Sequence, residues 1–273
     1  MGTQHDAPRR GRYRVPPVGI LVPAAVALAF LVLPFVALLD AAPWSALPGL
    51  VTSPAVREAL WLSLRSASAA TALSVLLGVP LAWVIARGDV PGAGLLRAVV
   101  TMPLVLPPVV GGVALLMLLG RRGLLGRHLE AWFGVTIPFT TLAVVIAATF
   151  VAMPFLIVSV DGALRSADSR MEEASATLGA SRWYTFRRVT LPHVAPGIGA
   201  GAVLCFARAL GEFGATITFA GNFPGTTRTM PLAVYLALEQ DPDAAIALSL
   251  VLIAVSLGVL LLLRGRWLTG PLS

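Results

Sequence analysis

The chain has 273 residues, of which 57% are hydrophobic and 12% charged, and its mean hydropathy is +0.86. Soluble domains carry about 25% charged residues, so this composition excludes a water-soluble globule and indicates an integral membrane protein. The formal net charge is +7, all 20 basic residues are arginines, and the lack of lysine excludes a P-loop ATPase and a Schiff-base enzyme.

Six apolar stretches predict an all-α bundle of six transmembrane helices. A helix that crosses the hydrocarbon core needs about 20 apolar residues. The predicted spans are 18–39, 66–86, 98–119, 140–160, 195–219 and 244–263. The fifth apolar run is too short to cross on its own, so its helix must continue past Glu212 and carry Arg208 and Glu212 at depth. A shorter helix is expected from Thr229 to Glu239, outside the membrane.

The arginines set the expected orientation. Residues 1–17 hold four of them and precede an apolar run of about 22 residues, which is longer than the roughly 7–15 of a cleaved signal sequence. We therefore expect a cytoplasmic N-terminal tail and then one membrane domain over 18–273. If the spans alternate in direction, 13 of the 20 arginines lie on the same side of the membrane as the N-terminus. Arginines are in excess on the cytoplasmic side, so the count predicts a multi-pass cell-membrane protein with both termini in the cytoplasm. Arginines that flank apolar segments indicate a lipid bilayer as partner and no nucleic acid.

The longest cytoplasmic loop, 161–194, carries helix signals of its own. Acidic residues open the segment from Met171 to Leu178, and Gly179 follows at the position where a left-handed residue ends a helix. Ser181 can cap a second short turn. The pattern predicts a bent helix–glycine–helix element of fixed shape. By itself it suits a docking element and a structured connection between two spans about equally well.

Seven residues of this loop have a distinctive spacing: Glu173-Ala174-Ser175, three residues, Gly179, nine residues, Val189, one residue, Leu191-Pro192. The spacing resembles the EAA loop of ABC-importer permeases, with Ser175 for the second alanine and Val189 for isoleucine. The resemblance implies a type I permease bundle whose loop forms a coupling helix against a separate ATPase subunit. The missing lysine agrees with ATP hydrolysis in that partner, so no catalytic residue is expected here.

Two further segments resemble one branch of these permeases more than the others. Met102–Gly111 and Phe206–Phe219 are similar to the molybdate/tungstate branch of these permeases, with sulfate permeases close behind, although Thr227 stands where that branch has glutamate. The resemblance implies an importer for molybdate, with tungstate or sulfate as the alternatives. It also implies an extracytoplasmic oxyanion-binding protein. Because each chain offers one docking loop and ATP sites come in pairs, we expect two copies to form one pathway as a homodimer.

Seven polar or helix-breaking residues of the third and fifth spans are candidates for the pathway: Pro107, Pro108, Arg208, Glu212, Gly214, Thr216 and Thr218. Prolines remove helical donors, and small neutral donors suit an oxyanion that binds transiently. Arg208 and Glu212 are four residues apart and can pair on one helix face. The pair either shapes an anion pathway or acts as a structural ion pair between helices.

Two other classes of function are less consistent with the sequence. An ion-coupled secondary transporter needs carboxylates within several spans, and only Glu212 qualifies. A membrane scaffold has no need of the EAA spacing. The histidines are scattered and the single cysteine, Cys205, lies in an apolar run, so neither a metal site nor a cofactor is expected.

Overall fold

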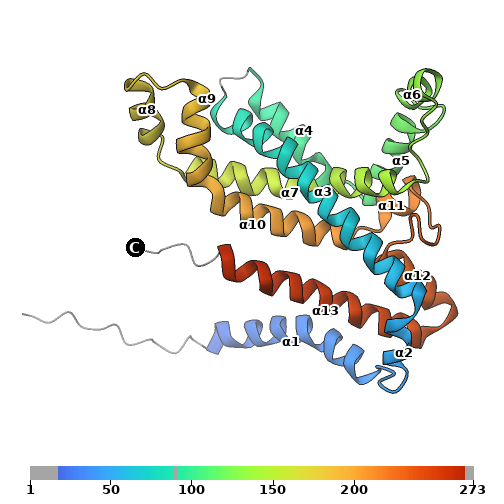
Figure 1. Ribbon diagram of the computed structural model, residues 1–273. Coiled ribbons are helices and arrows are strands. Elements are labelled where there is room, and N and C mark those ends of the chain that lie inside the picture. The colour runs from blue at the N-terminus through green and yellow to red at the C-terminus, as the bar shows by residue number, and fades with distance from the viewer. Residues whose placement is uncertain (1–17, 89–90, 268–273) are drawn as a thin grey trace, which may run out of the picture. The chain divides into compact units, whose positions relative to one another are not determined.

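Figure 1 shows a computed structural model of the protein, which describes residues 18–88 and 91–267. Every regular element in these ranges is a helix. In chain order they are α1 (Val18–Asp40), α2 (Leu47–Thr52), α3 (Pro54–Arg87), α4 (Ala93–Val105), α5 (Pro108–Leu119), α6 (Gly126–Phe133), α7 (Thr141–Ser166), α8 (Arg170–Thr177), α9 (Arg182–Thr185), the π-helix η1 (Phe186–Thr190), α10 (Leu191–Leu210), α11 (Gly214–Phe219), α12 (Met230–Gln240) and α13 (Pro242–Trp267).

The chain divides into two units, residues 1–42 and 43–273. The first contains α1, a helix of 23 residues that is apolar along its whole length, with Pro23 and Pro34 inside it. A helix that is apolar all round and of this length suits a membrane span. The predicted helix over 18–39 is thus confirmed, whereas the tail before it lies outside the described residues.

The second unit is built around α7, which packs against α3 and α10. Figure 1 shows α3 crossing both of these helices. The contacts are lined by small, fully buried side chains such as Ala67 and Ala70 on α3 and Ala152 on α7. In a bilayer, small residues stabilise a bundle because they let the backbones approach closely and increase dispersion contacts.

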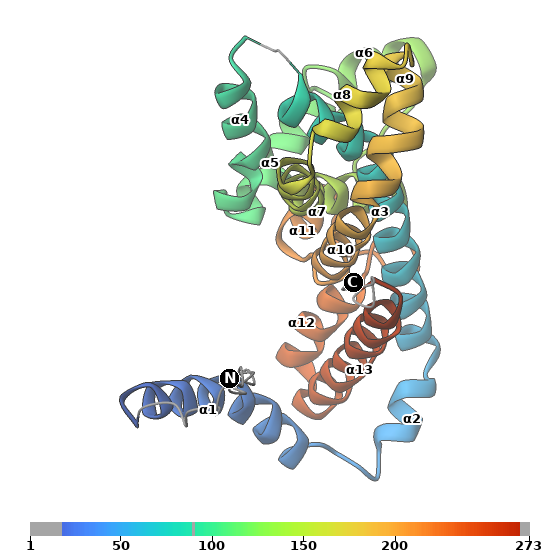
Figure 2. The ribbon, with the colours of Figure 1, turned by 90° about the vertical axis from the view of Figure 1, so that its left-hand side faces the viewer.

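Two smaller clusters extend the core. One joins α5, α7 and α11 around Leu115, Val144 and Phe219. The other joins the start of α3 to α12 and α13 around Met230 and Leu248. Helices α12 and α13 lie side by side in Figures 1 and 2. Within this unit, α8 and α9 lie at one end of the bundle and α6 and α12 at the other, so the 161–194 loop lies at the opposite end from these two helices (Figure 1).

Several helices begin or end at other residues than predicted. Helix α3 runs unbroken for 34 residues from Pro54, because nothing in the sequence before Ser66 interrupts a helix. Helix α7 continues past the predicted end at residue 160 to Ser166. The short helix expected from Thr229 to Glu239 is confirmed as α12, and its place outside the membrane stays a prediction.

Two predicted continuous spans are wrong in detail, because each is broken. The third predicted span, 98–119, is two helices, α4 and α5, whose axes differ by 115°. The fifth, 195–219, ends as α10 at Leu210 and resumes as α11 at Gly214. In the described part of the chain, five helical runs are long and apolar enough to cross a membrane, or six if the bent α4–α5 pair is one span.

Candidate coupling loop and translocation pathway

The 161–194 loop adopts the predicted helix–glycine–helix shape. At the N-terminus of α8, Asp168 Oδ1 accepts a 2.9 Å hydrogen bond from the backbone N–H of Arg170 and so satisfies one of the free donors of the first turn. The helix ends before Gly179, whose φ of +81° lies in the left-handed region that glycine adopts without strain. Ser181 then caps α9, its Oγ accepting a 3.2 Å hydrogen bond from the backbone of Tyr184. The local structure expected from Gly179 and Ser181 is confirmed.

The seven loop residues chosen from the sequence fall into two groups by position. The first group lies on α8 and in the bend that follows it, and consists of Glu173, Ala174, Ser175 and Gly179. Val189 is half-buried near the end of η1, and Leu191 packs against the main core cluster. Pro192 lies in the first turn of α10, directly after the π-helix η1, and has no backbone N–H to donate. The second group therefore anchors the loop to the membrane helix that follows it.

The loop presents exposed apolar side chains beyond the bundle. Leu178 is 89% exposed, and Met171, Trp183 and Tyr184 are each more than half exposed. Between the two short helices lies a hollow of about 460 Å³ bordered by Ser175, Leu178 and Tyr184, among others. Ser175 and Thr185 hold the two helices together through hydroxyls 3.0 Å apart. A patch of this kind on a water-facing loop is typical of a protein-binding surface.

The two broken spans meet each other. Helix α4 ends at Val105, and the bend follows at Pro107 and Pro108, where two consecutive prolines remove backbone donors and disfavour helical geometry before them. A Cβ placed on Gly214, the first residue of α11, would lie 2.9 Å from Cβ of Pro108 and 3.1 Å from the backbone nitrogen of Val109. The breaks at the predicted pathway residues Pro108 and Gly214 are thus in direct contact, and only a glycine fits there.

The predicted pair of Arg208 and Glu212 is present. Arg208 Nη1 lies 2.6 Å from Glu212 Oε2, and the glutamate side chain is 2% exposed against 26% for the arginine. Glu212 lies in the break between α10 and α11, where its Oε1 accepts a 2.8 Å hydrogen bond from the backbone of Ala215. The carboxylate therefore neutralises a charge at depth and also caps the helix that follows.

The two candidate threonines differ in their hydroxyl contacts. Thr218 Oγ1 donates to the carbonyls of Gly214 and Ala215, at 2.9 and 3.2 Å. Thr216 is 1% exposed, and its Oγ1 has no hydrogen-bond partner within the part of the chain that the structure describes. Of the two, Thr216 therefore has a buried hydroxyl that no described group satisfies.

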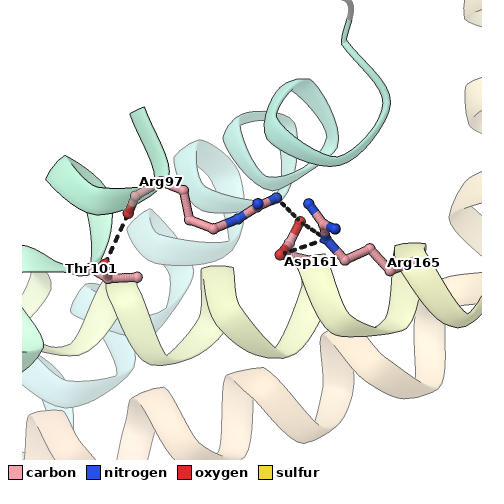
Figure 3. Close-up of polar contacts among 4 residues, drawn as sticks. All are labelled: Arg97, Thr101, Asp161 and Arg165. Carbon is pink, nitrogen blue, oxygen red and sulfur yellow. Dashed lines mark hydrogen bonds and ion pairs between the residues drawn. The ribbon is translucent and has the colours of Figure 1, made fainter. Parts of the chain in front are cut away.

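Charged side chains at the α8 end of the bundle were not singled out from the sequence. Figure 3 shows Asp161 on α7 between two arginines: Arg97 Nη2 on α4 is 3.2 Å from Oδ1, and Arg165 Nε is 3.1 Å from each carboxylate oxygen. The hydroxyl of Thr101 donates a 2.9 Å hydrogen bond to the backbone carbonyl of Arg97 (Figure 3). The cluster fixes α4 to α7. Its only signal in the sequence is charge next to an apolar run, which does not identify partners.

The fold defines a class of protein. The chain superimposes on a protein of known structure, described as the crystal structure of a bacterial alginate ABC transporter in complex with an alginate pentasaccharide-bound periplasmic protein, with a TM-score of 0.69 and 22% identity. The match covers 90% of this chain and 92% of the other. The fold is therefore that of an ABC-transporter permease, an all-helical protein that passes several times through a membrane.

The family follows from the sequence comparisons. Residues 74–269 match the family described as binding-protein-dependent transport system inner membrane component, and the chain belongs to this family. It is 50% identical to the molybdenum transport system permease protein ModB of Mycobacterium tuberculosis over 90% of this chain and 92% of that protein. It is 36% identical to the sulfate transport system permease protein CysT of Escherichia coli over 78% of this chain and 77% of that one.

Proposed function

We propose that this chain is the membrane subunit of an ATP-driven importer for molybdate. The observation that carries the proposal is the 50% identity to a molybdenum permease over 90% of the chain. The exposed helix–glycine–helix loop supports it. A permease whose ATP hydrolysis takes place in a separate subunit needs a surface of fixed shape where that subunit can bind. Tungstate is the nearest alternative substrate, and the 36% identity to a sulfate permease makes sulfate the second candidate.

The motor in this proposal is a separate cytoplasmic ABC ATPase that binds the EAA residues Glu173–Ser175 and Gly179. The exposed Leu178 and Trp183 would be covered by it, which removes their apolar surface from water. ATP hydrolysis then takes place in the partner, and this chain acts as a transporter subunit with both termini and the coupling loop in the cytoplasm.

The pathway in this proposal is formed by two copies of the chain, with an extracytoplasmic binding protein that delivers the anion. The meeting point of the two broken spans, together with the half-buried Thr218, offers small and neutral groups. Arg208 is already neutralised by Glu212 at 2.6 Å, so no unpaired cation at this pair would trap a dianion. Weak, neutral contacts agree with transport, because a bound anion must also leave.

Selectivity among oxyanions is expected mainly in the binding protein. Molybdate, tungstate and sulfate are all tetrahedral dianions, so charge does not separate them. Separation by size needs a closed, preformed pocket, and a pathway between two subunits that opens in every cycle is a poor place for one. The permease itself should therefore tolerate all three anions.

The test is uptake by proteoliposomes that contain this chain, its ATPase and its binding protein. We expect uptake of labelled molybdate with ATP and none with ADP, strong competition by excess tungstate, and little by sulfate. Equal competition by sulfate would assign the complex of this chain with its binding protein to the sulfate branch. No ATP-dependent uptake of any of the three anions would refute the importer.

A further inference from the structure

One arginine at the end of α3 contacts the parts of the chain where the loop begins and ends. Arg87 Nη2 donates a 3.2 Å hydrogen bond to the carbonyl of Ala167, the residue that ends α7. Its Nε lies 3.4 Å from Oε2 of Glu172 on α8. The other oxygen of Glu172 accepts a 3.0 Å hydrogen bond from Thr190 Oγ1, directly before α10. Four segments are thus joined through one guanidinium and one carboxylate.

These contacts are sheltered from water. The side chains of Arg87 and Glu172 are 20% and 22% exposed, and Thr190 is 3% exposed. Partial burial reduces solvent screening, so this pair contributes more than a fully exposed surface ion pair. One helical turn before Arg87, Trp83 packs edge-to-face against Phe186 of η1 with ring centroids 5.7 Å apart. The same face of α3 therefore holds the loop by a polar and an aromatic contact.

The two neighbouring glutamates of α8 have different surroundings. Glu172 faces the bundle and contacts Arg87 and Thr190. Glu173, the first residue of the EAA spacing, is exposed, and its Oε1 accepts a 3.1 Å hydrogen bond from Ser169 at the start of the same helix. Residues one apart on a helix point about 100° away from each other, which accounts for the difference. Glu172 is placed to hold the loop, whereas Glu173 is free to contact a partner.

Helix α3 is well suited to carry a displacement of the loop. It is continuous over 34 residues, about 50 Å at the rise of an α-helix, and it packs against both α7 and α10. A loop fixed to its end cannot move without moving α3 or breaking the contacts of Arg87. A loop joined only by chain connectivity could tilt while the bundle stayed still.

We propose that Arg87 and Glu172 form a latch that ties the coupling loop to α3, and that Arg87 is a positioning residue for coupling. The proposal rests on the coupling role given to the loop under the proposed function. In it, Arg87 makes no contact with the ATPase or the anion. It transmits movement of the docked loop to the central helices of the bundle.

The first experiment needs neither partner nor substrate: hydrogen exchange of the α8 amides in the full chain, purified in detergent. We expect Arg87→Gln and Glu172→Gln each to lower protection by about fivefold or more, since a lost contact of about 1 kcal/mol has that effect on local opening. Glu173→Gln should keep wild-type protection, because Glu173 does not contact α3. Exchanging the charges, Arg87→Glu with Glu172→Arg, should recover the part of the protection that the ion pair supplies, but not the part due to the hydrogen bond that Arg87 donates to Ala167.

The second experiment measures the anions moved per ATP hydrolysed in the reconstituted complex. Arg87→Gln and Glu172→Gln should assemble with the ATPase yet lower this ratio by about fivefold or more, the low end of coupling between sites. Glu173→Gln should instead weaken assembly. Unchanged exchange in both latch variants would overturn the latch, and an unchanged ratio would overturn the positioning role. A wild-type complex that moves no oxyanion would refute the proposed function alone, because the exchange experiment decides the latch independently.

Discussion

The contact between α7 and α10 permits a sharp test of how the bundle packs. A Cβ placed on Gly197 of α10 would overlap the Cβ of Ala163 on α7. The backbones are so close that Ser159 Oγ donates a 3.1 Å hydrogen bond across to the carbonyl of Gly197. One turn further along α10, a Cβ on Gly201 would lie 2.9 Å from the Cβ of Ser159. The added methyl of Gly197→Ala therefore has no room unless the two helices separate.

The expected loss follows from these distances. Carbon atoms in contact lie about 3.5–4.0 Å apart, so even the methyl at Gly201 needs a separation of roughly 0.6–1.1 Å, and the methyl at Gly197 needs more. Overpacking of this kind costs about 1–3 kcal/mol. Because each kcal/mol lowers the melting temperature of a chain of this size by roughly 2–4 °C, the effect of the methyl is about 2–12 °C.

The assay is thermal unfolding of the purified chain in detergent, with Gly162→Ala as the matched control. Gly162 also lies within a helix, but a Cβ there meets nothing within 4 Å. The gain in helix propensity from glycine to alanine is common to both variants, so the difference between their melting temperatures measures the overlap alone. Gly197→Ala combined with Ala163→Gly should recover most of the loss. Equal melting temperatures for the Gly197→Ala and Gly162→Ala variants would refute the packing of α7 on α10.

Three further predictions concern the loop, the ion pair and the orientation. The Gly179→Val variant should reach the membrane but lose ATPase association, because a β-branched residue is strained at a φ of +81°. Gly179→Asn should be tolerated, and normal uptake by the Gly179→Val variant would show that the loop has no role in coupling. Arg208→Gln and Glu212→Gln should each destabilise the chain by about 3–5 kcal/mol and the double variant by less than their sum, as judged by thermal unfolding; additive losses would mean that the two do not interact. In a Cys205→Ser background, Ser181→Cys should react with an impermeant reagent only after the cells are opened, and labelling of intact cells would reverse the orientation.

Much of this protein could be predicted from local patterns. The length of the apolar runs located the helices, because the thickness of the hydrocarbon core fixes how many residues a span needs. The bend of the coupling loop followed from Gly179 and Ser181, whose effects on the backbone depend only on neighbours in the chain. The pairing of Arg208 with Glu212 was accessible for the same reason, since a spacing of four residues brings two side chains to one helix face.

The tertiary structure alone decided which distant segments meet. The two consecutive prolines favoured a bend before α5, but not its size of 115° or its contact with Gly214. Nothing near Arg87 in the sequence identifies Glu172 as its partner, and Arg97 is likewise far along the chain from Asp161. In membrane helices most faces are apolar, so periodicity does not reveal which face packs inward. That choice is made by the fit of small residues between helices, and with it the position of each charged side chain at the helix ends.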